Sequence, residues 1–204
     1  MALACASVRP GFAAATGSTP QLILVLGDSL SAEYGLARGS GWVALLERRL
    51  ATEKIAARVV NASVSGETTD GGRNRLPALL AEHRPTLVVI ELGGNDALRG
   101  LPLSGTRANL GQMAHAARTA GAQVLVVGIQ VPPNYGQAYT RQFASLFAEV
   151  ARQEKAALVP FMLAGVADRA DYPSWFQADQ IHPVAAAHPI ILGNIWPALR
   201  SLLR

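Results

Sequence analysis

Short apolar runs alternate with longer amphipathic stretches along most of the chain. The apolar runs are rich in Val, Ile and Leu and are continuous rather than alternating, which is typical of strands that are covered on both faces. They predict five strands, at residues 22–26, 58–61, 87–92, 124–128 and 157–159.

The stretches between these runs have the periodicity of helices. In residues 42–50, the apolar side chains recur every three or four positions on one stripe, and the charged residues 47–49 lie largely off it. Further helices are predicted at about 70–82, 106–120, 139–154 and 189–203. The alternation of strand and helix indicates an α/β fold, with a parallel sheet, helices on both faces and right-handed crossovers.

Composition limits the classes of protein to consider. The chain has 204 residues, of which 50% are hydrophobic, and this suits one domain, which we place at residues 21–204. The formal net charge is +4, but no basic run with interleaved aromatic residues occurs, which argues against nucleic-acid binding. No apolar segment is long enough for stable membrane insertion. The four histidines and the single cysteine fall in no zinc-like spacing, so no metal site is expected.

Residues 1–20 differ in character from the rest. The stretch MALACASVRPGFAAATG is rich in small residues, and Ala13-Ala14-Ala15 fits an A-x-A cleavage site. A full export signal also needs a positive start and an unbroken apolar core, which Arg9-Pro10 interrupts. Two interpretations stay open, namely the remnant of an export signal that begins upstream and an unstructured N-terminal extension.

Polar residues gather where the predicted strands end. In doubly wound sheets, ligands bind beyond the carboxyl ends of the strands, near the point where the strand order reverses. Four strands run into small or polar residues there: Gly27-Asp28-Ser29, then 61–68, then Gly93-Gly94-Asn95-Asp96, then 130–135. We therefore expect the functional site at these ends.

Three residues are candidates for nucleophilic catalysis. Ser29 follows the first strand, and a serine nucleophile needs an adjacent base, which in turn needs an orienting acid. Near the C-terminus, Asp179 and His182 are three residues apart in QADQIHP, a spacing that places both side chains on the same side of one backbone turn. The other three histidines have no acid in a comparable motif. Ser29, His182 and Asp179 are therefore the predicted catalytic residues.

An acyl-transfer site also needs donors for the negative charge that develops on the carbonyl oxygen. Gly66 follows the second strand and offers an unobstructed backbone N–H, and Asn95 follows the third strand and offers a side-chain amide. Ser29 adds its own backbone N–H. These three residues form the predicted oxyanion hole.

At these residues the sequence resembles the GDSL hydrolases of the SGNH type, which are named for a Ser, a Gly, an Asn and a His in four motif blocks. Ser29, Gly66, Asn95 and His182 occur here in that order. The segments NASVSGET, RLPALL, ELGGNDALRG, PPNYG and IHP are similar to the bacterial thioesterase I, lysophospholipase L1 and arylesterase branch. The resemblance covers about residues 21–203.

The resemblance implies a flavodoxin-like α/β/α sandwich around five parallel strands. It also implies a serine esterase that hydrolyses ester and thioester bonds of small acyl substrates, without a cofactor, in the periplasm or outside the cell. Segments 96–102 and 131–136 are expected to flank an acyl groove, with the candidate substrate contacts Leu98, Leu101, Val131 and Tyr135. Two alternatives are a carbohydrate O-deacetylase of the same fold and a non-catalytic binding domain.

Four polar residues near the predicted site have structural interpretations. Asp28 is expected to hold backbone N–H groups of its own loop, and Ser31 to cap the segment that follows. Glu91 lies inside an apolar strand, so we expect backbone N–H groups to satisfy its carboxylate. Asp96 is assigned to loop structure.

Overall fold

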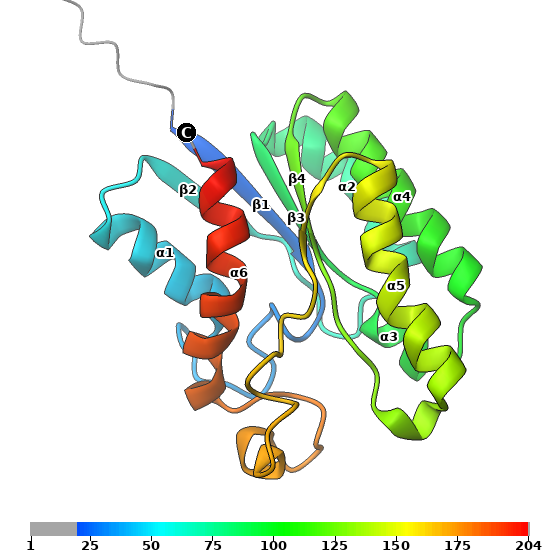
Figure 1. Cartoon of the computed structure of the whole chain (residues 1–204). Helices are drawn as coiled ribbons and strands as arrows, with labels where there is room; N and C mark the ends of the chain where they lie inside the picture. The colour runs from blue at the N-terminus through cyan, green and yellow to red at the C-terminus, as the bar shows by residue number, and fades with distance from the viewer. Residues whose placement is uncertain (1–19, 204) are drawn as a thin grey trace, which may run out of the picture.

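The computed structural model of the chain describes residues 20–203, and a five-stranded sheet forms its centre (Figure 1). The strands lie in the order β2-β1-β3-β4-β5, and each neighbouring pair is parallel. Their bounds are β1 Gln21–Gly27, β2 Ala57–Asn61, β3 Leu87–Glu91, β4 Gln123–Val127 and β5 Ala157–Val159. The five predicted strands are confirmed to within one residue at each end.

Helices cover both faces of the sheet, as expected, and the described residues form a three-layer α/β/α sandwich (Figure 1). One face carries α1 (Trp42–Thr52) and α6 (His188–Leu202). The other face carries α2 (Thr69–His83), α4 (Leu103–Thr119) and α5 (Gln137–Gln153). The sequence predicts all five of these helices, although α4 begins three residues earlier than expected, directly after Pro102.

Shorter elements were not predicted. They are the five-residue helix α3 (Gly94–Leu98) and three 3₁₀ turns, η1 (Pro133–Tyr135), η2 (Tyr172–Trp175) and η3 (Ala185–Ala187). Segments this short contain at most one helical repeat, so they leave no periodic pattern in the sequence.

The apolar strands separate the core into two halves. In β1, Ile23 and Val25 point toward α1 and α6, whereas Leu24 and Leu26 point toward α2, α4 and α5. All four side chains are fully buried. Because successive residues of a strand point to opposite faces, a strand that is covered on both sides has no polar positions, and this explains the continuous apolar runs.

The strand order determines where a site forms. The chain runs from β1 outward to β2 and then returns to β3 on the other side of β1, so the order reverses between β1 and β3. In the register of this pair, Gly27 lies opposite Glu91. The segments after these two strands, which contain Ser29 and Asn95, therefore begin side by side.

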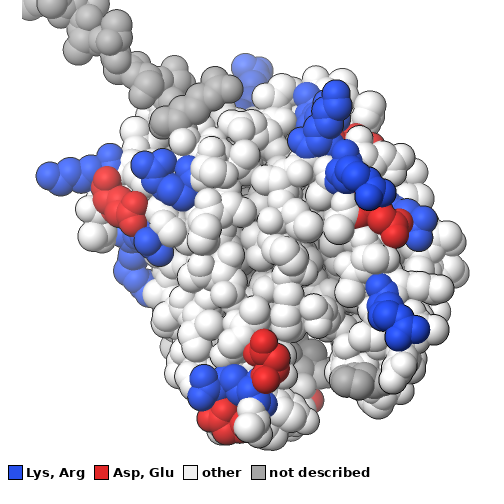
Figure 2. Space-filling view, in the orientation of Figure 1, with Lys and Arg blue, Asp and Glu red and all other residues white. Residues whose placement is uncertain are grey.

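Charged side chains are dispersed over the surface. Figure 2 shows Lys and Arg residues scattered around one face, several of them close to Asp or Glu, with no single basic patch on this face. Within residues 20–203, no helix combines the length and the hydropathy needed to cross a bilayer. The predicted cleavage site at residues 13–15 lies outside the described residues.

Candidate active site

Ser29 lies in a tight turn immediately after β1. The backbone N–H groups of Ser31 and Ala32 both donate to the carbonyl of Asp28, and this winds the chain back over the strand end. A β-carbon at Gly27 would lie 2.7 Å from Ser31 Oγ and 2.8 Å from Glu91 Oε2. The turn therefore needs glycine at this position because two side chains pack directly against it.

The structure brings the three predicted catalytic residues together. His182 Nε2 lies 2.8 Å from Ser29 Oγ, and His182 Nδ1 lies 2.6 Å from Asp179 Oδ2. The other oxygen of Asp179 accepts hydrogen bonds from the backbone N–H groups of Ile181 (2.9 Å) and His182 (3.0 Å). The three-residue spacing therefore places the two side chains on the same side of one backbone turn, as predicted, and the carboxylate faces the imidazole.

Gln177 connects this turn to the loop that contains Ser29. Its backbone N–H donates to the carbonyl of His182 at 2.7 Å. Its side-chain amide donates to the carbonyl of Tyr34 at 2.9 Å and to that of Pro183 at 3.2 Å. Because Tyr34 and Pro183 belong to segments that are far apart in the sequence, this one side chain fixes the histidine loop against the serine loop.

Two backbone N–H groups of the predicted oxyanion hole have no hydrogen-bond acceptor in the described part of the chain. Among the described residues, neither the N–H of Ser29 nor that of Gly66 donates to an acceptor. Gly66 has a φ of +79°, which favours glycine, and its carbonyl accepts a hydrogen bond from Arg99 Nη2 at 2.7 Å. The loop after β2 is further held by the N–H of Val64, which donates to the carbonyl of Gly27 at 3.0 Å.

Asn95 is the second residue of α3 and lies beside the Ser29 turn. Its Nδ2 donates to Asp28 Oδ2 at 3.0 Å, across 67 positions of sequence. The structure therefore gathers the predicted oxyanion-hole residues at the ends of β1, β2 and β3, around one serine.

This arrangement has a counterpart among known proteins. Residues 25–190 match the GDSL-like Lipase/Acylhydrolase family, a span that includes both Ser29 and His182. The chain belongs to this family. Members are acylhydrolases, so this GDSL hydrolase is an enzyme that cleaves esters, and the predicted enzyme class is confirmed.

Individual relatives support the assignment to this family. The chain is 56% identical over 183 residues to the esterase TesA of Pseudomonas aeruginosa, with 90% of each chain covered. It is 40% identical over 192 residues to the thioesterase 1/protease 1/lysophospholipase L1 of Escherichia coli, covering 94% of this chain and 88% of the relative. The crystal structure of TesA superposes with a TM-score of 0.86 at 56% identity, covering 90% of this chain and 100% of the other. The predicted branch and fold are thus confirmed.

Asp179 of this GDSL hydrolase keeps its charge over a wide pH range. Its partial burial by itself raises the pKa of the carboxyl group, but hydrogen bonds outweigh that effect. The backbone N–H groups of His182 and Ile181, together with the imidazole of His182, lower the pKa of Asp179 to about 2. The carboxylate is consequently available as an acceptor for Nδ1 at any ordinary pH.

Asp28 has the role expected for it and a further contact. Its Oδ1 accepts the backbone N–H of Leu30 at 3.0 Å, which confirms that the carboxylate holds its own loop. Its Oδ2 is the acceptor for Asn95. Burial raises the pKa of Asp28 to about 6, although these two hydrogen bonds and the nearby His182 act in the opposite direction.

The expected cap at Ser31 is wrong. The residue is buried, and its hydroxyl donates to Glu91 Oε2 at 2.6 Å and accepts the indole N–H of Trp42 at 3.1 Å. Glu91 therefore depends mainly on a side-chain hydroxyl, with a longer 3.4 Å bond from the backbone N–H of Asp28, and not on backbone groups alone as expected. Burial, and next the charge of Asp28, hold the pKa of Glu91 well above its usual range.

We expected Asp96 to lie in a loop, but it lies in the short helix α3. It accepts the backbone N–H of Thr69 at 2.9 Å, the hydroxyl of the same residue, and the hydroxyl of Thr106 at 3.2 Å. Since these threonines belong to α2 and α4, the carboxylate joins three helices directly behind Asn95.

The four predicted substrate contacts lie in two different environments. Leu98 is 50% exposed, and Leu101 and Tyr135 are exposed as well. Val131 is only 9% exposed and packs into the core on the α2, α4 and α5 side. The structure therefore leaves three of these side chains accessible and places Val131 beneath the surface.

Two residues that contact the site were not predicted from the sequence. The Tyr34 ring, 49% exposed, lies 4.3 Å from the imidazole of His182 between ring centroids, at an interplanar angle of 36°. Arg99, which bonds the carbonyl of Gly66, follows α3 directly. The position of Arg99 four residues after Asn95 is a weak signal, because one helical turn places both on one side, whereas no sequence pattern indicates Tyr34.

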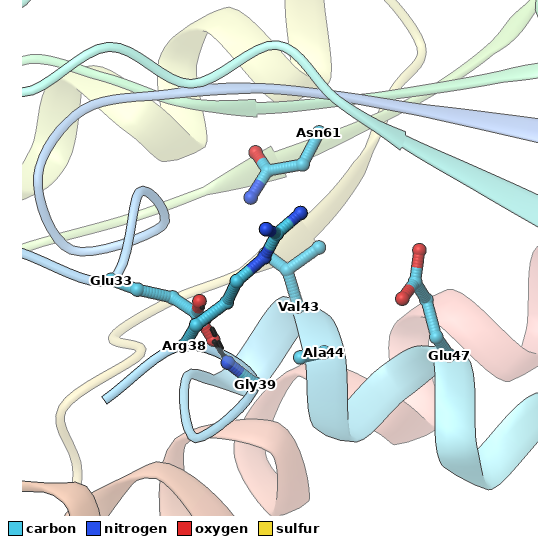
Figure 3. A pocket seen from close by; sticks show the side chains of 7 residues that line it. All are labelled: Glu33, Arg38, Gly39, Val43, Ala44, Glu47 and Asn61. Atoms are coloured by element: carbon cyan, nitrogen blue, oxygen red, sulfur yellow. Dashed lines mark hydrogen bonds between the residues drawn. The ribbon is translucent and has the colours of Figure 1, made fainter. Parts of the chain in front are cut away.

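A polar hollow of about 280 Å³ is lined by residues of the loop after Ser29, of α1 and of β2 (Figure 3). In it, the carboxylate of Glu33 accepts the backbone N–H groups of Gly39 and Gly41, and the guanidinium group of Arg38 extends toward Asn61. None of the predicted site residues lines it. The hollow therefore lies between the loop that precedes α1, the first turns of α1 and the end of β2. Among residues 20–203, no group of three or more His, Cys, Asp or Glu side chains is placed to hold a metal ion.

Proposed function

We propose that this enzyme hydrolyses acyl esters and thioesters with Ser29 as the nucleophile, His182 as the general base and Asp179 as its orienting acid. The observation that carries the proposal is the continuous contact from Ser29 Oγ through the imidazole to Asp179, with heavy-atom distances of 2.8 Å and 2.6 Å. With the Nδ1 proton directed at Asp179, Nε2 is the nitrogen that accepts the serine proton.

The reaction proceeds in two halves. Ser29 Oγ attacks the acyl carbonyl while His182 takes its proton, and the alcohol or thiol then leaves with that proton. Water repeats the sequence on the acyl-enzyme, which releases the acid and regenerates the serine. In both halves, the N–H groups of Ser29 and Gly66 and the amide of Asn95 stabilise the oxyanion, and the two free N–H groups support this assignment.

The substrate class follows from the side chains around the site and from relatives of 40% and 56% identity that carry the names esterase and thioesterase. Exposed Leu98, Leu101 and Tyr135 offer apolar surface to an acyl chain, and we assign Val131 to the wall beneath them. Burial of apolar surface contributes about 0.8 kcal/mol per methylene. We therefore expect kcat/KM to rise from acetyl toward medium-chain acyl groups, on oxygen esters and thioesters alike.

One panel of substrates tests the substrate range. It consists of p-nitrophenyl esters of increasing acyl length, the matching acyl-CoA thioesters and a lysophospholipid. A rise of about fourfold in kcat/KM per added methylene, until the groove is full, is the expected result. If acetyl esters are the best substrates and each added carbon lowers kcat/KM, the O-deacetylase alternative replaces this proposal.

Ser29 as the nucleophile is tested separately. A fluorophosphonate should label the wild type at Ser29 alone, and Ser29→Ala should fold normally and lose about 10⁶-fold in kcat, as other serine hydrolases do. Labelling of Ser31 instead, or substantial turnover by the alanine variant, would overturn the assignment.

We further propose a periplasmic or secreted location for a single hydrolase domain at 21–204, preceded by an N-terminal extension, residues 1–20, that export processing cleaves after Ala15. The A-x-A pattern at residues 13–15 supports this assignment. Fractionation of cells followed by N-terminal sequencing tests it, since a periplasmic protein that begins shortly after Ala15 is expected. A protein that keeps Met1 and remains in the cytoplasm would contradict it.

A further inference from the structure

The carboxylate of Asp28 is fixed at both of its oxygens. Oδ1 accepts the backbone N–H of Leu30, and Oδ2 accepts Nδ2 of Asn95, each at 3.0 Å. The side chain has little freedom to move, because the residue is only 2% exposed and lies between the ends of β1 and β3. Asp28 also directly precedes Ser29, so its position is tied to that of the proposed nucleophile.

This contact determines how the amide of Asn95 is oriented. A carboxylate whose two oxygens both accept hydrogen bonds can face only the NH₂ end of an amide, since the opposite orientation would place two oxygens against each other. Nδ2 carries two hydrogens, and Asp28 takes one of them. The second hydrogen points about 120° away and has no acceptor among the described residues.

We propose that Asp28 is a positioning residue of the oxyanion hole, which holds the Asn95 amide so that its free Nδ2 hydrogen is directed at the substrate oxygen. The inference rests on the proposed function, because it assigns Asp28 a role only through Asn95. An Asn side chain that rotates freely presents its carbonyl oxygen to the oxyanion for part of the time, and that orientation is repulsive. Fixing the amide in advance avoids this loss.

Glu91 provides a matched control in the same buried network. Its Oε2 accepts from Ser31 Oγ and from the backbone N–H of Asp28, and it makes no contact with Asn95. Glu91→Gln therefore disturbs a buried carboxyl of similar surroundings without touching the amide. Asp28→Asn, in contrast, replaces one accepting oxygen by an NH₂ group, which cannot accept from Leu30 and Asn95 together.

The experiment is a double-mutant cycle on kcat for a p-nitrophenyl ester. We expect Asp28→Asn to lower kcat about 10- to 100-fold, less than complete removal of the donor, with KM changed much less. In the Asn95→Ala background the same substitution should cost less than about threefold, because the group it positions is gone. Glu91→Gln should change kcat by the same factor in both backgrounds. Thermal unfolding of each variant verifies that it is folded.

A measurement on the wild type keeps the test independent of whether Asp28→Asn folds. Of the two Nδ2 hydrogens of Asn95, the one bound to Asp28 should exchange with solvent markedly more slowly than the other in NMR spectra. Equal, fast exchange of both, or an Asp28→Asn effect of the same size in both backgrounds, would overturn the positioning role. Failure of the proposed function looks different, since Asn95→Ala itself would then leave kcat unchanged.

Discussion

Two aspartates lie close to the Ser29–His182 pair, and their surroundings shift their pKa values in opposite directions. Asp28 is 2% exposed, and burial raises its pKa to about 6. Asp179 has a side chain that is 36% exposed, and despite some burial its pKa falls to about 2. The difference shows that the balance of desolvation against donated hydrogen bonds, rather than the residue type, decides the state of each carboxyl group.

The surroundings of each carboxyl explain this balance. Asp179 accepts two backbone N–H groups and an imidazole nitrogen in a turn that solvent reaches. Asp28 accepts one backbone N–H and one amide beneath the end of the sheet, next to buried Glu91. The first aspartate is therefore suited to stabilise a charge on His182, and the second to fix neighbouring groups.

The strongest test of this contrast is the substitution Asp179→Asn. An amide at this position cannot hold His182 in the productive tautomer, so we expect kcat to fall about 10⁴-fold, as in other serine hydrolases. Stability at neutral pH should fall only modestly, because solvent screens the partly exposed carboxylate of Asp179. Steady-state kinetics and thermal unfolding measure both effects, and a decrease below about tenfold in kcat would show that Asp179 is not the orienting acid.

Next in size is the effect of Asn95, the amide that Asp28 contacts. Loss of one oxyanion donor costs about 10²–10³-fold in kcat in other enzymes, and we expect a loss of that order for Asn95→Ala. KM should change much less, because the bond strengthens in the transition state. An effect mainly on KM would mean that Asn95 binds the substrate in its ground state.

The pH dependence of stability should separate the two aspartates directly. The pKa of Asp28 is raised in the folded state from 3.8 to about 6, so its contribution to stability is fully present below about pH 3.8 and is lost as the pH rises through 6. The pKa of Asp179 is lowered to about 2, so its contribution is present above pH 3.8 and is lost as the pH falls through 2.

Denaturant unfolding across this pH range provides the measurement. Relative to the wild type, Asp28→Asn should gain about 2 kcal/mol in the free energy of unfolding between pH 4 and 6. Asp179→Asn should show no such gain in that window and should differ from the wild type in its response to pH only below pH 4. Parallel curves for Asp28→Asn and the wild type would mean that Asp28 titrates alike in the folded and unfolded chains.

The smallest expected effect concerns the exposed side of His182. The Tyr34 ring packs at a tilt against the imidazole, and aromatic ring pairs contribute about 0.5–1.5 kcal/mol. Tyr34→Ala should therefore lower kcat/KM roughly 2- to 10-fold by loosening the imidazole. Tyr34→Phe keeps the ring and is the matched control, for which near-wild-type activity is expected. Equal losses in both variants would assign the effect to the hydroxyl group instead.

The sequence by itself determined the five strands and the five long helices, and it supplied the candidates for the reactive residues. Continuous apolar runs define strands that are covered on both faces, and a helical stripe recurs over ten or more residues, so both are local patterns. The spacing of Asp179 and His182 is local as well, because three residues span one turn. Ser29, Gly66 and Asn95 could be predicted because each follows a strand, where parallel sheets bind ligands.

Only the tertiary structure decided which of these groups touch and how solvent reaches them. Asp28 meets Asn95 across 67 positions because β1 and β3 are neighbours in the strand order, and Ser31 turns inward because Glu91 and Trp42 lie beneath it. The contact of the Tyr34 ring with His182 and the burial of Val131 in the core also depend on segments that are far apart in the sequence. Contacts between distant segments and the burial of a carboxyl group depend on how whole elements pack, and no window of sequence contains that information.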